Sequence, residues 1–108
     1  MKLRQWEIWK ARPEGFASDH WFVLVSGQER LDSPRHNQVN GLACFTLRGP
    51  LNSTDVRLSA AEGFGAPTAC QCDLVYFLDK RKLQGSQGLV SWERQQQIKS
   101  KIKELLRL

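Results

Sequence analysis

Residues 68–79 read TACQCDLVYFLD and form the strongest strand signal in the chain. This run is longer than the usual strand of about five or six residues, so we expect a bend or bulge along it. Asp73 interrupts the apolar residues, and a buried carboxylate without a partner costs several kcal/mol. Asp73 is therefore either a functional acid or an acid that a nearby cation or backbone N–H pairs.

Strand alternation predicts which residues of this run share a face. One face carries Gln71, Asp73, Val75 and Phe77, and the other carries Cys72, Leu74, Tyr76 and Leu78. Both faces contain apolar side chains. We therefore expect one face to meet the core and the other to meet a second element or a second subunit.

Four further segments read as strands, namely residues 5–10, 21–26, 42–47 and 55–59. Residues 21–26 (WFVLVS) are almost wholly apolar, which predicts a strand covered on both faces. Between the second and third strands, residues 27–41 are rich in turn residues and predict a long connection of the kind that often carries function.

A helix is expected over residues 91–107, with Ser91 as its N-cap. Its apolar positions are Ile98, Ile102, Leu105 and Leu106, and basic residues occupy the opposite side. Trp92, beside the cap, is expected to hold the helix against the sheet. The order of elements, with the strands first and one helix last, predicts a mainly β fold: a small half-open barrel of about five to seven strands. We expect a single domain over residues 1–108.

Composition indicates a soluble globular protein, with 41% hydrophobic and 25% charged residues. The chain lacks a run of about 20 apolar residues, so no membrane span is expected. Its opening residues, MKLRQWEIWK, do not read as a signal peptide. We therefore expect a cytoplasmic protein.

The chain has three cysteines, Cys44, Cys70 and Cys72, and this odd number favours a reducing compartment over a disulfide framework. Cys70 and Cys72 should share one strand face, and a zinc site with a histidine would need a second ligand pair that the spacing does not offer. Buried structural thiols are the favoured interpretation, and no metal or cofactor is expected.

The net charge of +5 lies at one end of the chain. Residues 1–78 hold eight Lys or Arg and eight Asp or Glu, whereas residues 79–108 hold eight Lys or Arg against three acids. Such a basic segment can follow a phosphate backbone, dock an acidic partner, or form a solvated helix face.

Five short motifs, in chain order, resemble the PemK/MazF/Kid toxins of bacterial toxin–antitoxin pairs. They are Glu7-Ile8-Trp9, FVLVS at 22–26, CFTL at 44–47, Cys72-Asp73 followed by Asp79, and Gly88-Leu89-Val90-Ser91 with the closing helix. The resemblance covers nearly the whole chain. It implies the SH3-like, half-open CcdB/PemK-type barrel, acting as a homodimer.

In function, the resemblance implies an endoribonuclease that cuts single-stranded mRNA without a metal, by attack of the ribose 2′-hydroxyl. It also implies an acidic antitoxin as a protein partner. A third possibility, poisoning of DNA gyrase as by CcdB, is disfavoured because the chain ends KELLRL and lacks the Trp-Gly-Ile ending of such inhibitors. No DNA partner is expected.

The resemblance also implies candidate site residues. Asp73 falls on a carboxylate proposed as acid or base, Glu7 on a second acidic position, and Thr46 on a hydroxyl that holds the scissile phosphate. His20 stands where the family has an arginine before its second strand, and is a third catalytic candidate. The candidate substrate-binding residues are Thr46, Arg48 and Gln71, with Arg48 as a replacement cation.

The chain departs from the family at three cationic positions, which are His20, Gln71 and Tyr76 here. Loss of a cation that stabilises a phosphorane costs about two or three orders of magnitude in rate. The alternative interpretation is therefore a catalytically degenerate barrel that serves as an RNA- or protein-binding module.

Overall fold

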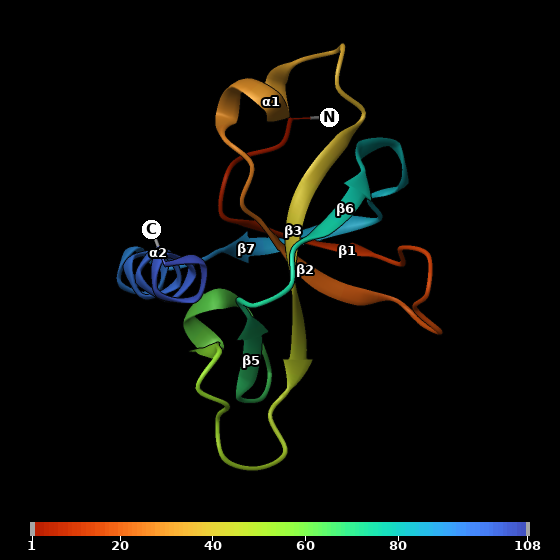
Figure 1. The fold of residues 1–108 in the computed structure, drawn as a ribbon. Helices are drawn as coiled ribbons and strands as arrows, with labels where there is room; N and C mark the ends of the chain where they lie inside the picture. The colour runs from red at the N-terminus through yellow and green to blue at the C-terminus, as the bar shows by residue number, and fades with distance from the viewer. Residues whose placement is uncertain (1, 108) are drawn as a thin grey trace.

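The described part of the chain forms a curled sheet of seven antiparallel strands, with one long helix at its side (Figure 1). The computed structural model describes residues 2–107. Its elements are β1 (Glu7–Ala11), β2 (His20–Leu24), α1 (Gln28–Asp32), β3 (Gln38–Thr46), β4 (Asp55–Leu58), η1 (Ala60–Glu62), β5 (Thr68–Gln71), β6 (Tyr76–Asp79), η2 (Lys80–Lys82), β7 (Gly85–Leu89) and α2 (Trp92–Leu106). The mainly β half-barrel with a carboxyl-terminal helix is thus confirmed.

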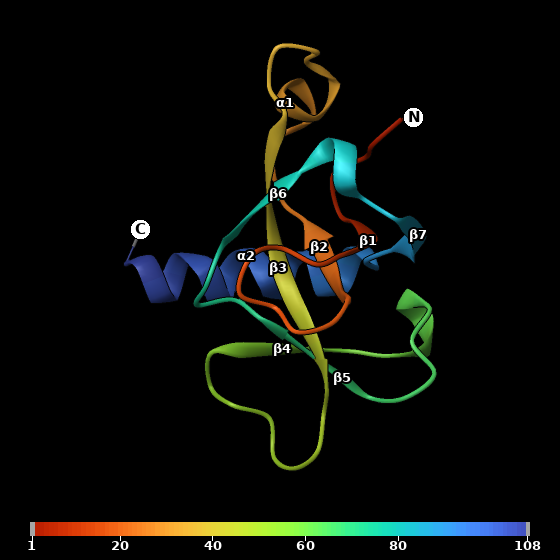
Figure 2. The same cartoon turned by 90° about the vertical axis from the view of Figure 1, so that its right-hand side faces the viewer.

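β3 is the central strand of the sheet, because β5 and β6 both pair with the same edge of it. The strand order is β4-β5-β3-β2-β1-β7, and β6 also pairs with β3. Residues 38–41 of β3 pair with β6, and residues 44–46 pair with β5. The run 68–79 therefore breaks over residues 72–75, which confirms the predicted bend. Figure 2 shows α1 and the loop after β3 at opposite ends of the molecule.

Apolar side chains form two cores, one on each face of the sheet. Val23 contributes to the core that also contains Ile8, Leu42 and Ile98. Its neighbours Phe22 and Leu24 contribute to the second core. β2 is therefore covered on both faces, as its continuous apolar run predicts.

α2 closes the first core. The Ser91 hydroxyl accepts a hydrogen bond from the Arg94 backbone N–H at 3.4 Å, which confirms the predicted cap. Ile98 is fully buried, and Ile102 and Leu105 pack against the same core. The prediction for Trp92 was wrong, because its side chain is 73% exposed. Trp92 lies six residues before Ile98, and helical geometry places the two on different faces.

The sequence pattern missed β7, whose residues GSQGL are polar and rich in glycine. β7 forms because the outer edge of β1 supplies its hydrogen-bond partners. Its register shifts between Glu7 and Trp9, as in a β-bulge, and Gly88 nearby adopts φ +104°, a conformation that favours glycine.

The expected long connection over residues 27–41 is also more ordered than predicted. It contains α1 and the first four residues of β3. No helix within residues 2–107 has the length and apolar character that crossing a bilayer would require.

The three cysteines are buried in the first core as free thiols, which confirms the structural interpretation. Cys44 lies directly opposite Cys70 in the β3–β5 pair. Within residues 2–107 the structure contains no group of three or more His, Cys, Asp or Glu side chains arranged to hold a metal ion.

Candidate functional site

The end of β3 forms the wall of a hollow that opens toward β2. Its volume is about 350 Å³, and it is lined by Asp19, His20, Trp21, Cys44, Phe45, Thr46 and Arg48. We call this the β2-side hollow. Thr46 is the exposed last residue of β3, and Arg48 follows in the exposed turn. No ion pair joins Arg48 to another residue of the described chain, so its guanidinium can pair with a ligand.

His20 is held in one orientation by two aromatic rings and a carbonyl. Its ring lies edge-on to Phe16 and Phe45, with centroid separations of 5.0 Å for each. Its Nδ1 lies 3.1 Å from the Ser18 carbonyl oxygen. Because a carbonyl only accepts hydrogen bonds, Nδ1 carries the proton in the neutral ring, and Nε2 keeps its lone pair. His20 thus has the tautomer of a proton acceptor at Nε2.

A second hollow, of about 320 Å³, lies along the opposite edge of β3. Its lining residues are Phe45, Thr46, Leu47, Arg48, Gly49, Pro50, Asn52, Asp55, Ala69 and Gln71. We call it the β5-side hollow, since Ala69 and Gln71 come from β5. The two hollows share Phe45, Thr46 and Arg48. Gln71 is directly opposite Asp55 in the β4–β5 pair.

Asp73 lies outside both hollows. It is exposed in the connection between β5 and β6. The predicted alternation is confirmed only in part: Val75 and Phe77 are exposed and Cys72 and Leu78 are buried, but Leu74, expected on the face of Cys72, is 52% exposed because residues 72–75 lie between the strands.

Glu7 also lies away from the hollows. It begins β1, whereas Ala11, at the other end of that strand, is the residue paired with His20. The Glu7 Oε1 accepts hydrogen bonds from the Arg4 backbone N–H at 3.0 Å and from Trp9 Nε1 at 2.9 Å. These contacts give the Glu7 carboxylate a structural role.

Four of the six predicted site residues therefore converge on the end of β3: His20, Thr46, Arg48 and Gln71. Together they offer a proton acceptor, a hydroxyl, a free cation and an amide. Phe45 and Asp55 were missed by the sequence reasoning. Asp55 carries no local signal, because only the register of β4 against β5 brings it beside Gln71.

Tyr76, at the third position where the toxins that the sequence resembles have a cation, packs with other rings. Its ring lies 5.1 Å from that of Phe16 and 5.8 Å from that of Phe22, centroid to centroid. Tyr76 thus supports Phe16, which in turn contacts His20.

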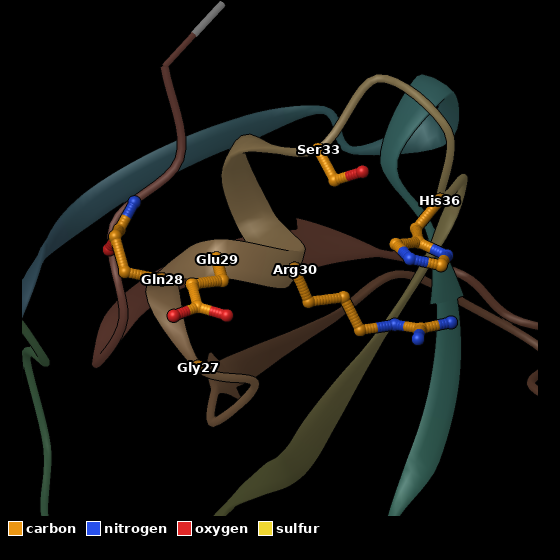
Figure 3. A pocket seen from close by; sticks show the side chains of 6 residues that line it. All are labelled: Gly27, Gln28, Glu29, Arg30, Ser33 and His36. Carbon is orange, nitrogen blue, oxygen red and sulfur yellow. The ribbon is translucent and has the colours of Figure 1, made fainter.

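A larger hollow, of about 720 Å³, lies at α1 and the loop after it. Its lining residues are Gly27, Gln28, Glu29, Arg30, Ser33 and His36 (Figure 3). The loop is fixed by Lys80, whose Nζ donates to the carbonyl oxygens of Arg30 at 2.7 Å and Ser33 at 2.8 Å. None of the predicted site residues lines this hollow, so we place the candidate chemistry at the end of β3.

Next to Asp73 the surface is unusually apolar. Leu74, Val75 and Phe77 are 52%, 50% and 69% exposed, and we call them the apolar patch. β6 pairs with β3 along one edge, and no other described strand pairs with its outer edge. Exposed apolar residues beside an open sheet edge are typical of a protein–protein contact.

Comparison with protein-family models and with curated proteins gave no match. Among solved structures, the Mycobacterium tuberculosis toxin MazF-mt6 has a TM-score of 0.79 at 17% identity, covering 94% of this chain and 97% of that one. An endoribonuclease from a mycobacterial species, in complex with its cognate antitoxin, has a TM-score of 0.77 at 15% identity, covering 99% of this chain and 95% of that one. These likenesses show that the chain has the fold of the MazF-type toxins.

Proposed function

We propose that this protein is a MazF-like toxin that cleaves single-stranded mRNA without a metal or another cofactor. The observation that carries the proposal is the convergence of His20, Thr46 and Arg48 on one hollow. A mycobacterial endoribonuclease and a toxin share the fold, which supports the same class of activity.

In the proposed reaction, the 2′-hydroxyl oxygen attacks the adjacent phosphorus while its proton passes to His20 Nε2. Arg48 stabilises the negative charge that develops on the phosphorane, and the Thr46 hydroxyl donates a hydrogen bond to a phosphate oxygen. The bond from phosphorus to the 5′-oxygen then breaks, and the leaving oxygen takes up a proton. The products are a 2′,3′-cyclic phosphate and a 5′-hydroxyl.

We assign the protonation of the leaving oxygen to Asp73 of a second subunit. Asp73 adjoins the apolar patch, so the assignment requires a homodimer in which the patch of each subunit lies against the β2-side hollow of the other. Glu7 is not needed in this scheme, because its carboxylate is engaged by Arg4 and Trp9.

An acidic antitoxin is the proposed protein partner. The charge excess of residues 79–108 complements an acidic chain, and one structural neighbour was solved with its cognate antitoxin. An mRNA substrate and such a partner would place the protein in a bacterial cytoplasm.

The test is digestion of a single-stranded RNA by purified protein in excess EDTA. We expect cleavage by the wild type, a loss of about 10²- to 10⁴-fold in His20→Ala, and a loss of about 10²- to 10³-fold in Arg48→Ala. Asp73→Ala is run alongside and should also lose activity. His36→Ala and Arg35→Ala, at exposed positions outside the β2-side and β5-side hollows, serve as matched controls and should cleave normally.

A folded wild type that binds RNA without cleaving it would support the second candidate, a binding module. The observation that favours this module is the replacement of three family cations by His20, Gln71 and Tyr76. Equal cleavage by the wild type and His20→Ala would remove His20 from the mechanism.

A further inference from the structure

We propose that the two hollows are a dinucleotide site, and that Asp55 and Gln71 select guanine as the base on the 3′ side of the cut. This inference rests on the proposed endoribonuclease activity and adds the identity of one substrate base. It starts from the three residues that the hollows share, Phe45, Thr46 and Arg48.

The shared residues fix where a phosphate would lie. Thr46 and Arg48 face both hollows, so a phosphate bound there has one hollow on each side. The two volumes, about 350 and 320 Å³, are nearly equal and lie at the lower end of the range of small-molecule sites. A phosphodiester with one nucleoside on each side matches this division.

The position of His20 sets the direction of the RNA. The attacking 2′-hydroxyl belongs to the nucleotide on the 5′ side of the scissile phosphate, and it must reach His20 Nε2. That nucleotide therefore takes the β2-side hollow, which alone of the two contains His20. The nucleotide on the 3′ side takes the β5-side hollow.

In the β5-side hollow, Asp55, which is 7% exposed, and the half-buried Gln71 place a carboxylate beside an amide. They are direct partners across β4 and β5, so their side chains leave the sheet on the same side, with Cβ atoms about 5 Å apart. Asp55 is held by Thr54, whose hydroxyl donates to its Oδ1 at 3.0 Å. Thr54 thus fixes the carboxylate without using all of its acceptor sites.

Guanine is the base that satisfies this pair most fully. Its Watson–Crick edge carries two adjacent N–H donors, which match the two oxygens of Asp55, and a carbonyl oxygen, which accepts from the amide of Gln71. Adenine, cytosine and uracil each present only one donor position to a carboxylate on that edge. Single-stranded RNA leaves this edge free to be read.

The first experiment is digestion of a random single-stranded RNA pool, followed by sequencing of the 3′ products. We expect guanine to be enriched at their first position. In a defined substrate, replacing that guanine by hypoxanthine, which lacks the amino group, should slow the wild type about tenfold, because a bond to a charged acceptor is lost. Asp55→Asn should lose the enrichment and respond little to the replacement. Asp32→Asn, the same change at an exposed position on α1 outside both hollows, is the matched control and should keep it.

Gln71→Leu gives a second variant at an unburied position, in case Asp55→Asn disturbs folding, and should also weaken the guanine preference. Cleavage with no guanine preference, or with a preference that survives both variants, overturns the inference and leaves the proposed function standing.

The second experiment does not depend on cleavage. Dinucleoside phosphates that carry guanine or hypoxanthine on the 3′ side, with a 2′-O-methyl group on the first ribose, are titrated while the Gln71 side-chain amide is followed by NMR. A shift that is larger with guanine supports the inference even if the wild type cleaves nothing, in which case only the endoribonuclease proposal fails. If the NMR signal of the Gln71 amide does not shift with either ligand, the base assignment is overturned. If the signals of both Gln71 and His20 stay unchanged and the wild type does not cleave RNA, both proposals are overturned.

Discussion

The Glu62 carboxylate lies at the start of α2, where its Oε2 accepts a hydrogen bond from the Ser91 backbone N–H at 3.2 Å. Its other oxygen, Oε1, accepts from the Ser59 backbone N–H at 2.9 Å, in the capping box of η1. Glu62 is only 1% exposed. One buried carboxylate therefore ties η1 to the junction of β7 and α2.

Replacing this carboxylate should destabilise the whole domain. Glu62→Ala leaves two backbone N–H groups without their charged acceptor, and we expect the free energy of unfolding to fall by about 2 to 4 kcal/mol. Urea unfolding measures the change. Glu93→Ala, an exposed acid in the first turn of α2, is the matched control and should change stability by less than about 0.5 kcal/mol. Equal effects of the two substitutions would contradict the role of Glu62.

The buried thiols should be unreactive in the native protein. Hydrogen bonding to Cys44, together with burial, raises the pKa of Cys70, and hydrogen bonding to Cys70, together with burial, raises that of Cys72. Thiols held in the protonated form are poor nucleophiles. Alkylation at pH 8 should therefore require unfolding in guanidinium. A cysteine introduced at the exposed position Ser53 (Ser53→Cys) gives the reference rate, and native wild-type thiols that matched this rate would disprove the prediction.

Local patterns were enough to predict the elements whose residues carry their own signal. β2 is apolar after its first residue, His20, and α2 combines the Ser91 cap with apolar residues at helical spacing. β7 carries no such local signal. Gly85 and Gly88 weaken its strand propensity, and it forms only because it pairs with the edge of β1, which is distant in the sequence. The local sequence pattern of a segment does not show that it pairs with a strand far away in the chain.

The candidate site shows the same division. His20, Thr46 and Arg48 were named from the resemblance to the toxin family, and they lie at or just after the ends of β2 and β3, two strands that the sequence pattern also predicted. Asp55 depended on the β4–β5 register, which short strands do not fix from sequence. Trp92 was misplaced because its apolar character was taken as a sign of contact with the sheet, whereas its position on α2 faces outward.

The ion pair between Asp79 and Arg81 should make stability depend on pH in acid. Hydrogen bonds from the Arg81 guanidinium, at 3.0 and 2.8 Å, and from its backbone N–H lower the pKa of Asp79 from 3.8 to about 2. The folded state thus favours the charged carboxylate, so this contribution is present above pH 3.8 and is lost as pH falls toward 2.

In Arg81→Gln, an NMR titration should show the pKa of Asp79 rising toward its ordinary value, and the difference in stability from the wild type should shrink below pH 3.8. Lys82→Gln removes a neighbouring positive charge that makes no hydrogen bond to Asp79, and should raise the pKa of Asp79 less. An unchanged pKa in Arg81→Gln would show that the backbone N–H alone holds the carboxylate.

The apolar patch should be the dimer contact. Covering Phe77, which is 69% exposed beside the open edge of β6, removes a large aromatic side chain from water, and such residues often dominate binding energy. Phe77→Asp buries an unpaired charge in that contact, so we expect the dimer to dissociate, with a Kd raised by at least about thirtyfold, the change that about 2 kcal/mol produces. Sedimentation equilibrium measures the Kd, and circular dichroism checks that the variant is folded.

Leu106→Asp places the same charge at another exposed apolar residue, on α2, and should leave the dimer intact. If the wild type sediments as a monomer, or if Leu106→Asp dissociates the dimer and Phe77→Asp does not, the patch is not the subunit contact, and the transfer of Asp73 into a partner's site fails with it.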